Sequence, residues 1–175
     1  MVARAVLLLW ALLHAALAGA GGITETDDAG HAVSLAEPAR RIVSLAPNIT
    51  EILFHVGAGS LIIGADEYSN YPEAAKSIPR LNNHATANYE AILGLAPDLV
   101  IGWQSGNGAV PGRIRALGLP VFEVEPHRLD DIPALFLRFG RLTGHTAQAS
   151  ARAEEFSRRL RALRAAQAEI GRAHV

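Results

Sequence analysis

The sequence contains no cysteine, which excludes disulfides, thiolate metal ligands and a lipidated cysteine. Its stability must therefore come from the burial of apolar side chains. With 175 residues and a hydrophobic content of 50%, the chain can bury the core of one domain but not of two. The formal net charge of −1 provides no concentrated basic face, so we expect no nucleic-acid partner.

Motifs of the common catalytic and metal sites are missing as well. The sequence has no Gly-x-Ser-x-Gly elbow, no P-loop and no Gly-x-Gly-x-x-Gly after a predicted strand. Its seven histidines are widely spaced and include no His-x-x-x-His pair, so we predict no metal site and no catalytic residues. A small extracytoplasmic enzyme stays an alternative, with Glu67 beside Asp66 as its one obvious candidate base.

The most continuous apolar run lies at the amino terminus. Arg4 precedes Val6–Leu13, and the small-residue sequence Ala16-Leu17-Ala18 follows, an order typical of a secretory signal peptide. The run is shorter than the ~20 residues of a membrane-spanning helix. We expect residues 1–18 to be removed on secretion, which leaves a chain that does not span the membrane; a signal anchor is the alternative.

Residues 19–40 are predicted to form an N-terminal hairpin and extension. Two segments of alternating polarity, Ile23–Thr26 and His31–Leu35, flank the turn-rich sequence Asp27–Gly30. Pro38 then ends the extension and marks the start of a different pattern.

Residues 41–145 alternate between predicted strands and helices joined by short segments that contain glycine or proline. The predicted strands are 41–45, 61–65, 98–102 and 120–124, and the predicted helices are 50–56, 87–95, 110–117 and a longer one from 130 to a stop at Gly144. This alternation is typical of parallel strands with crossover helices, so we predict an α/β lobe.

A further helix is predicted over residues 146–168. Thr146 can cap it, and apolar residues recur at spacings of four and three while Arg and Glu fill the other face. At a rise of 1.5 Å per residue it would be about 30 Å long, and would need something extended to lie against. A terminal helix packed on its own lobe fits the periodicity equally well. Gly171 interrupts the pattern, and we interpret residues 169–175 as a non-native tail in place of a longer natural chain.

Polar and aromatic residues gather where the predicted strands end. The loops Leu45–Asn48, Asp66–Pro72 and Trp103–Gly108 all follow strands, and an open parallel sheet binds ligands beyond the carboxyl ends of its strands. Two of these loops carry Tyr68, Tyr71 and Trp103, although aromatic residues make up only 6% of the chain. Such side chains suit a large, flat, partly apolar ligand; the alternative is that they only shield the end of the sheet.

Four segments carry a resemblance to a known family. They are Arg41–Glu51 (RIVSLAPNITE), Tyr68–Pro72 (YSNYP), Asn88–Leu93 (NYEAIL) and Pro97–Trp103 (PDLVIGW). Over roughly residues 41–168 the chain resembles the periplasmic cobalamin-binding proteins of vitamin B12 importers, members of a superfamily of helical-backbone binding proteins for haem, siderophores and cobalamin. The Pro-Asp-Leu-Val element is common to that superfamily, whereas the tyrosine loop and Trp103 indicate a corrinoid binder more narrowly.

The resemblance implies two Rossmann-like lobes bridged by one long helix, with the ligand held between them. Residues 41–145 would then be the N-terminal Rossmann-like lobe and residues 146–168 the interlobe helix, with the second lobe missing. The family further implies a monomeric periplasmic protein without a catalytic cofactor, which delivers a corrinoid to the permease of an ABC transporter. Glu90 matches the glutamate that docks on permease arginines; from the residues alone it is an ordinary first-turn glutamate.

The predicted ligand-binding residues follow from the same match. Tyr68 and Trp103 correspond to the aromatic side chains that pack on the corrin, and Tyr71, Asn48 and His84 complete the predicted set. His84 is a departure, because the cobalamin binders have a further tryptophan before the helix that carries the docking glutamate. A haem or ferric-siderophore binder is therefore the first alternative, although the tyrosine ligand of the haem binders is not found at this loop. A sensor domain of the same fold is another alternative.

Overall fold

The structure, a computed structural model, describes residues 22–83 and 86–173. The predicted signal peptide and the predicted ligand residue His84 lie outside these ranges. Within them, no helix combines the length and the apolar character needed to cross a membrane.

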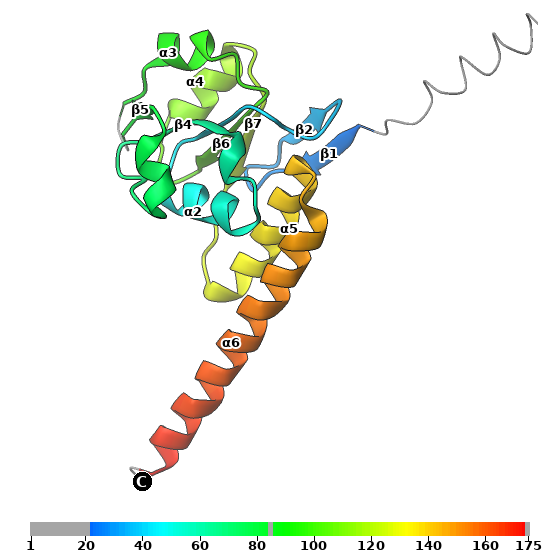
Figure 1. Cartoon of the computed structure of the whole chain (residues 1–175), viewed down its shortest axis with the longest axis vertical. Coiled ribbons are helices and arrows are strands. Elements are labelled where there is room, and N and C mark those ends of the chain that lie inside the picture. Colours follow the sequence, from blue (N-terminus) through cyan, green and yellow to red (C-terminus); the bar gives the residue numbers. More distant parts are fainter. Residues whose placement is uncertain (1–21, 84–85, 174–175) are drawn as a thin grey trace, which may run out of the picture.

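Five parallel strands form the central sheet and confirm the predicted α/β lobe (Figure 1). Their spatial order is β5 (Arg80–Asn82), β4 (Ile62–Asp66), β3 (Ile42–Ser44), β6 (Leu99–Trp103) and β7 (Val121–Val124). The chain starts at β3 in the middle, adds strands on one side, and then returns to add β6 and β7 on the other. The order therefore reverses between β3 and β6, which is where open parallel sheets bind their ligands.

Helices cover both faces of this sheet. One face carries α2 (Pro47–His55), α5 (Ile132–Thr143) and the start of α6 (Thr146–Ala173), whereas the other carries α3 (Tyr89–Gly94) and α4 (Val110–Ala116). Short 3-10 turns are η1 (Gly59–Leu61), η2 (Glu73–Ser77) and η3 (Leu129–Asp131). Because both faces are covered, Ile101 is buried toward α2 and α5 while Val100 is buried toward α3 and α4.

Helix boundaries differ from the predictions where proline intervenes. We expected the first helix to begin at Thr50, but α2 begins at Pro47, because the fixed φ of proline suits the first turn of a helix and its missing N–H is not needed there. The long helix expected from residue 130 is divided into η3 and α5, and Pro133 stands in the first turn of α5. Gly144 ends α5 as predicted, with a left-handed φ of 76°.

The predicted hairpin is confirmed as β1 (Ile23–Thr26) paired antiparallel with β2 (Ala32–Leu35). Its turn covers the edge strand β7: the backbone N–H of Asp28 donates to the carbonyl of Glu123 at 2.9 Å, and the N–H of Glu123 donates to the Asp27 carboxylate at 3.2 Å. An edge strand that would otherwise be open to pairing is thus satisfied by the hairpin.

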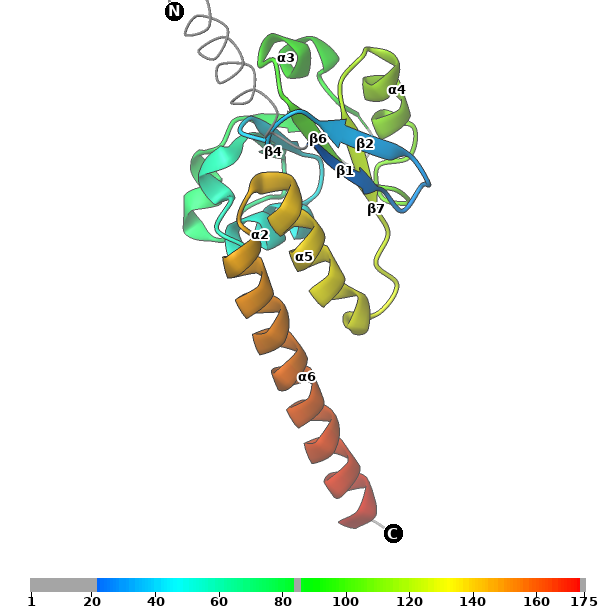
Figure 2. The ribbon, with the colours of Figure 1, turned by 90° about the vertical axis from the view of Figure 1, so that its right-hand side faces the viewer.

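Helix α6 both packs on the lobe and projects from it (Figures 1 and 2). Its first turns lie close against α5, since a Cβ added to Gly140 would come within 2.3 Å of the Ala149 Cβ. Every side chain described from 161 to 168 is exposed, and Leu163 is 68% exposed. The helix spans 28 residues, about 42 Å at 1.5 Å per residue. It continues through Gly171 to Ala173, so the expected end of the helix near residue 168 is wrong.

Candidate functional site

The carboxyl ends of the sheet strands form a rim that carries the predicted aromatic residues. Tyr68 follows β4 and is 56% exposed, Tyr71 lies in the same loop and is 59% exposed, and Trp103 ends β6 and is 37% exposed. Strand β3 separates β4 from β6, so the two loops leave the sheet about 10 Å apart at a strand spacing of ~4.8 Å. Tyr68 and Trp103 therefore follow strands on either side of β3.

A chain of buried hydroxyl groups lies beneath the tyrosine loop. The Thr50 hydroxyl donates to the Ser44 hydroxyl at 2.8 Å and lies 2.9 Å from the Ser69 hydroxyl, and all three residues are fully or almost fully buried. The buried Asp66 carboxylate accepts the backbone N–H of Tyr68 at 2.8 Å. These contacts join β3, α2 and the tyrosine loop, so the exposed tyrosines stand on a fixed base.

The carbonyl of Leu45 connects the loops on both sides of β3. It accepts the side-chain amide of Asn82 at 3.0 Å and that of Asn107 at 2.9 Å. Asn107 is 3% exposed, and its side-chain oxygen accepts the backbone N–H of Trp103 at 2.6 Å. The three predicted post-strand loops thus converge as expected, and buried amides hold them together.

Glu125, which follows β7, contacts the loop that follows Trp103 on the neighbouring strand β6. Its two carboxylate oxygens accept the backbone N–H and the hydroxyl of Ser105, both at 2.8 Å. Partial burial alone would raise the pKa of Glu125, but the hydrogen bonds from Ser105, together with the charge of His127, outweigh it and lower the pKa.

Asn48 lies at the rim but faces a different space. It stands in the first turn of α2 and lines an open apolar groove with Phe136 of α5 and Phe156 of α6. Its side-chain oxygen is buried and receives no hydrogen bond from any residue that the structure describes. The structure therefore places Asn48 on the α5 side of the rim, apart from the aromatic loops.

Helix α3, which carries Glu90, lies on the side of the lobe away from the free end of α6 (Figure 1). Glu90 is exposed in the first turn of α3, whose N-cap is Asn88 with its side-chain oxygen accepting the Ala91 N–H at 3.0 Å. A carboxylate in this position is favoured by the helix dipole and is free to meet a cationic partner.

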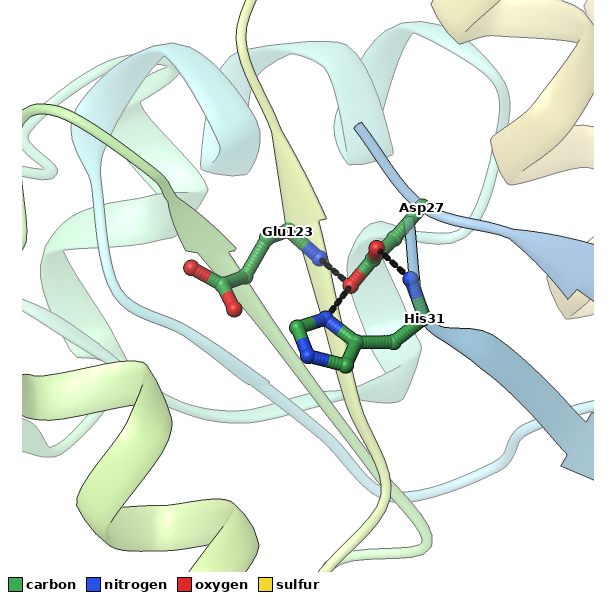
Figure 3. A group of neighbouring side chains, drawn as sticks. All are labelled: Asp27, His31 and Glu123. Atoms are coloured by element: carbon green, nitrogen blue, oxygen red, sulfur yellow. Dashed lines mark hydrogen bonds and ion pairs between the residues drawn. The ribbon is translucent and has the colours of Figure 1, made fainter. Parts of the chain in front are cut away.

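One group of described side chains has the composition of a metal site (Figure 3). Asp27, His31 and Glu123 each offer one ligand atom, and these atoms lie within 4.8 Å of one another. The guanidinium of Arg115 already lies 2.7 Å from Glu123 and 3.4 Å from Asp27. A bound cation would have to displace that charge, so we interpret the group as an ion-pair network that fixes the hairpin to β7.

The fold and rim define the class of protein, and a family model described as "Periplasmic binding protein" matches residues 42–175. The chain belongs to this family. Among its relatives is the vitamin B12-binding protein of Yersinia pestis, 35% identical over 130 residues, which covers 74% of this chain and 46% of that protein. The chain spans about half the length of the curated relatives it matches.

Solved structures agree with this assignment. The periplasmic vitamin B12-binding protein of Vibrio cholerae matches with a TM-score of 0.71 and 36% identity, covering 75% of this chain and 52% of that one. The haem-binding protein HmuT matches with a TM-score of 0.66 and 27% identity, covering 76% and 44%. The chain is thus similar to solved periplasmic proteins that bind vitamin B12 and to solved proteins that bind haem.

Several residues that shape the rim were not predicted from the sequence. Ser44 and Asn82 end strands, Ser69, Asn107 and Glu125 lie within four residues after a strand, and Thr50 lies in α2. A polar side chain at or soon after the end of a strand is the one signal that most of them share, and many residues with no role at the rim share it too. It does not distinguish a residue that supports the site from one that merely faces water.

Proposed function

We propose that this chain is the N-terminal lobe and interlobe helix of a periplasmic solute-binding protein that captures cobalamin or a related corrinoid. Tyr68 and Trp103 carry the proposal, because they are exposed on rigid loops on either side of the sheet's switch point. Stacking on aromatic faces gives contact area without ligation of the cobalt, so the ligand can leave when the lobes open. The vitamin B12-binding relatives support this choice of ligand.

The test uses the chain extended to the length of its relatives and titrated calorimetrically with cyanocobalamin, haemin and a ferric siderophore. We expect cyanocobalamin to bind and Trp103→Ala to weaken it by about 10- to 100-fold, from the loss of 1.5–3 kcal/mol of apolar burial. Trp103→Phe should retain most of the affinity. Leu117→Ala, at an exposed apolar residue on the end of α4, is the control and should bind normally.

Haem is the second candidate ligand, because a haem-binding protein matches the fold almost as well as a cobalamin-binding one. Tight haemin binding without cyanocobalamin binding would overturn the corrinoid assignment. Binding of neither, with all variants folded, would instead favour a sensor or another function for the lobe.

We further propose that Glu90 docks the protein on the permease of an ABC transporter. Its exposed carboxylate at the start of α3 can form charge-assisted hydrogen bonds with arginine. In a reconstituted importer, Glu90→Ala should slow uptake while ligand binding is unchanged, and Glu37→Ala should alter neither. Equal loss of binding and uptake in Glu90→Ala would contradict the docking role.

A catalytic role is not part of the proposal. Asp66, the neighbour of the candidate base Glu67, is 2% exposed and accepts the Tyr68 N–H and the Asn82 amide. It therefore supports the rim from below. Glu67 is exposed beside it without an activated partner among the described residues.

A further inference from the structure

The indole of Trp103 rests on the backbone of its own loop. A Cβ added to Gly106 would lie 2.1 Å from Cε3 of the indole, far inside van der Waals contact. One face of the ring is therefore covered by the backbone of Gly106. Any side chain at position 106 would prevent this close approach. The 37% exposure of the residue belongs to the remaining surface, which points away from the loop.

The backbone of Trp103 is held independently of the ring. Asn107 accepts its N–H and donates a backbone N–H to its carbonyl at 2.8 Å, while the Asn107 amide reaches Leu45. These contacts place the Cα of Trp103 but leave rotation about its side-chain bonds free. The indole is instead placed by the Gly106 backbone that covers one of its faces.

Glu125 holds the residue directly before Gly106 and is itself held in place. Its carboxylate accepts the backbone N–H and the hydroxyl of Ser105, both at 2.8 Å. Its backbone N–H donates to the Asp28 carboxylate at 2.7 Å, and Asp28 in turn accepts Arg138 at 2.6 Å. Glu125 thus joins the hairpin and the end of β7 to the loop that covers the indole.

We propose that Glu125 is a positioning residue: by holding Ser105, it fixes the Gly106 backbone against one face of the Trp103 indole, so that the other face is presented to the ligand. This role rests on the proposed function, since it assumes that the ligand stacks on Trp103. With one face of the ring already covered by a fixed loop, a flat ligand meets a surface that needs no reordering on binding.

The sequence provides a direct probe of this role. The two tryptophans are Trp10 and Trp103, so Trp10→Phe leaves Trp103 as the single tryptophan of the full chain. Its near-ultraviolet circular dichroism and its quenching by acrylamide report the orientation and the exposure of the indole without any ligand. Glu37→Gln, at an exposed glutamate between the hairpin and β3, is the matched control.

In this background, Glu125→Gln should reduce the Trp103 dichroism and raise the acrylamide quenching constant about twofold, whereas Glu37→Gln should change neither. Glutamine keeps one acceptor oxygen, so Glu125→Ala should show the larger change. In the extended chain, Glu125→Gln should weaken corrinoid binding by about tenfold, the value of one charge-assisted hydrogen bond. If Glu125→Gln does not fold, Ser105→Ala removes one of the two contacts that hold the carboxylate and should give a smaller change of the same sign.

The pH dependence separates positioning from general stabilisation. The pKa of Glu125 is lowered, so its contacts are complete at neutral pH and are lost as the pH falls through a value below the ordinary 4.5. The Trp103 signal should change in that range in the parent and not in Glu125→Gln. An unchanged Trp103 signal in Glu125→Gln would overturn the positioning role. A changed signal in an extended chain that binds no corrinoid would uphold the placement of the indole and overturn the proposed ligand instead.

Discussion

The rim of the sheet and the far half of α6 are both exposed, but they are exposed in different ways. At the rim, the aromatic side chains stand on buried hydrogen bonds such as those of Thr50 and Asn107. In α6, every described side chain from 161 to 168 is exposed, and the ion pair of Arg164 with Asp130 is the contact that reaches back to η3. The rim is supported from within the lobe, and the far half of α6 is not.

This difference separates the parts that contacts within the lobe hold in place from the part that they do not. The core on both faces of the sheet and the rim loops are held by residues of the lobe. The far half of α6 projects from the lobe and exposes Leu163, so this part of the helix has surface available to pack on something else. This supports the proposal that α6 bridges to a second lobe across the ligand.

The largest effect is expected from a large-to-small change in the core beneath α5. Phe139 is fully buried, so Phe139→Ala should lower the free energy of unfolding by about 3–5 kcal/mol, from lost burial and the cavity left behind. Leu163→Ala in the far half of α6 should change it by less than about 0.5 kcal/mol. Urea denaturation followed by circular dichroism measures both, and comparable losses would show that the far half of α6 packs on the lobe.

An intermediate effect is expected at the base of the rim. Asn107→Ala leaves the Trp103 N–H without its acceptor in a buried setting, which should cost about 1–3 kcal/mol of stability. The exposed Asn70, in the tyrosine loop, is the control, and Asn70→Ala should stay within about 0.5 kcal/mol of the parent. Urea denaturation again measures both; equal stability of the two variants would mean that the buried amide does not hold the loops.

The strands and helices that are marked by a hydrophobic run, and by a glycine or proline at its end, were predictable. The continuous apolar run of 98–102 and the stop at Gly144 are local patterns, and both appear where expected. Strand β5 was missed because it has three residues, of which Arg80 is exposed. So short and polar a segment becomes a strand only through pairing with β4, and that pairing is not visible in the local sequence.

The candidate site also has a part that could be predicted from the sequence and a part that could not. Tyr68 and Trp103 were predictable because exposed aromatic residues after buried strands are few in this chain. Their supports were not, since the Leu45 carbonyl joins residues 37 and 62 positions away. Such contacts depend on strand order, which the sequence pattern left open. The roles of the predicted ligand residues stay predictions that the binding experiments test.

The smallest expected effect is at the ion pair that links η3 to α6. Both oxygens of Asp130 accept the Arg164 guanidinium, at 2.9 and 2.7 Å, and this contact lowers the pKa of Asp130 below its ordinary value of 3.8. The pair is therefore complete at neutral pH and is lost as the pH falls through that lowered value. Both side chains are exposed, so salt should weaken it.

Arg164→Ala should leave global stability unchanged and increase the mobility of the far half of α6, seen as lower backbone order parameters for residues 161–168 by nuclear magnetic resonance relaxation. Arg161→Ala, one turn earlier without a described ion pair, is the control. In the extended chain the same substitution should have little effect, because a second lobe would hold the helix. A large loss of order there would mean that α6 is held by Asp130 and not by a second lobe.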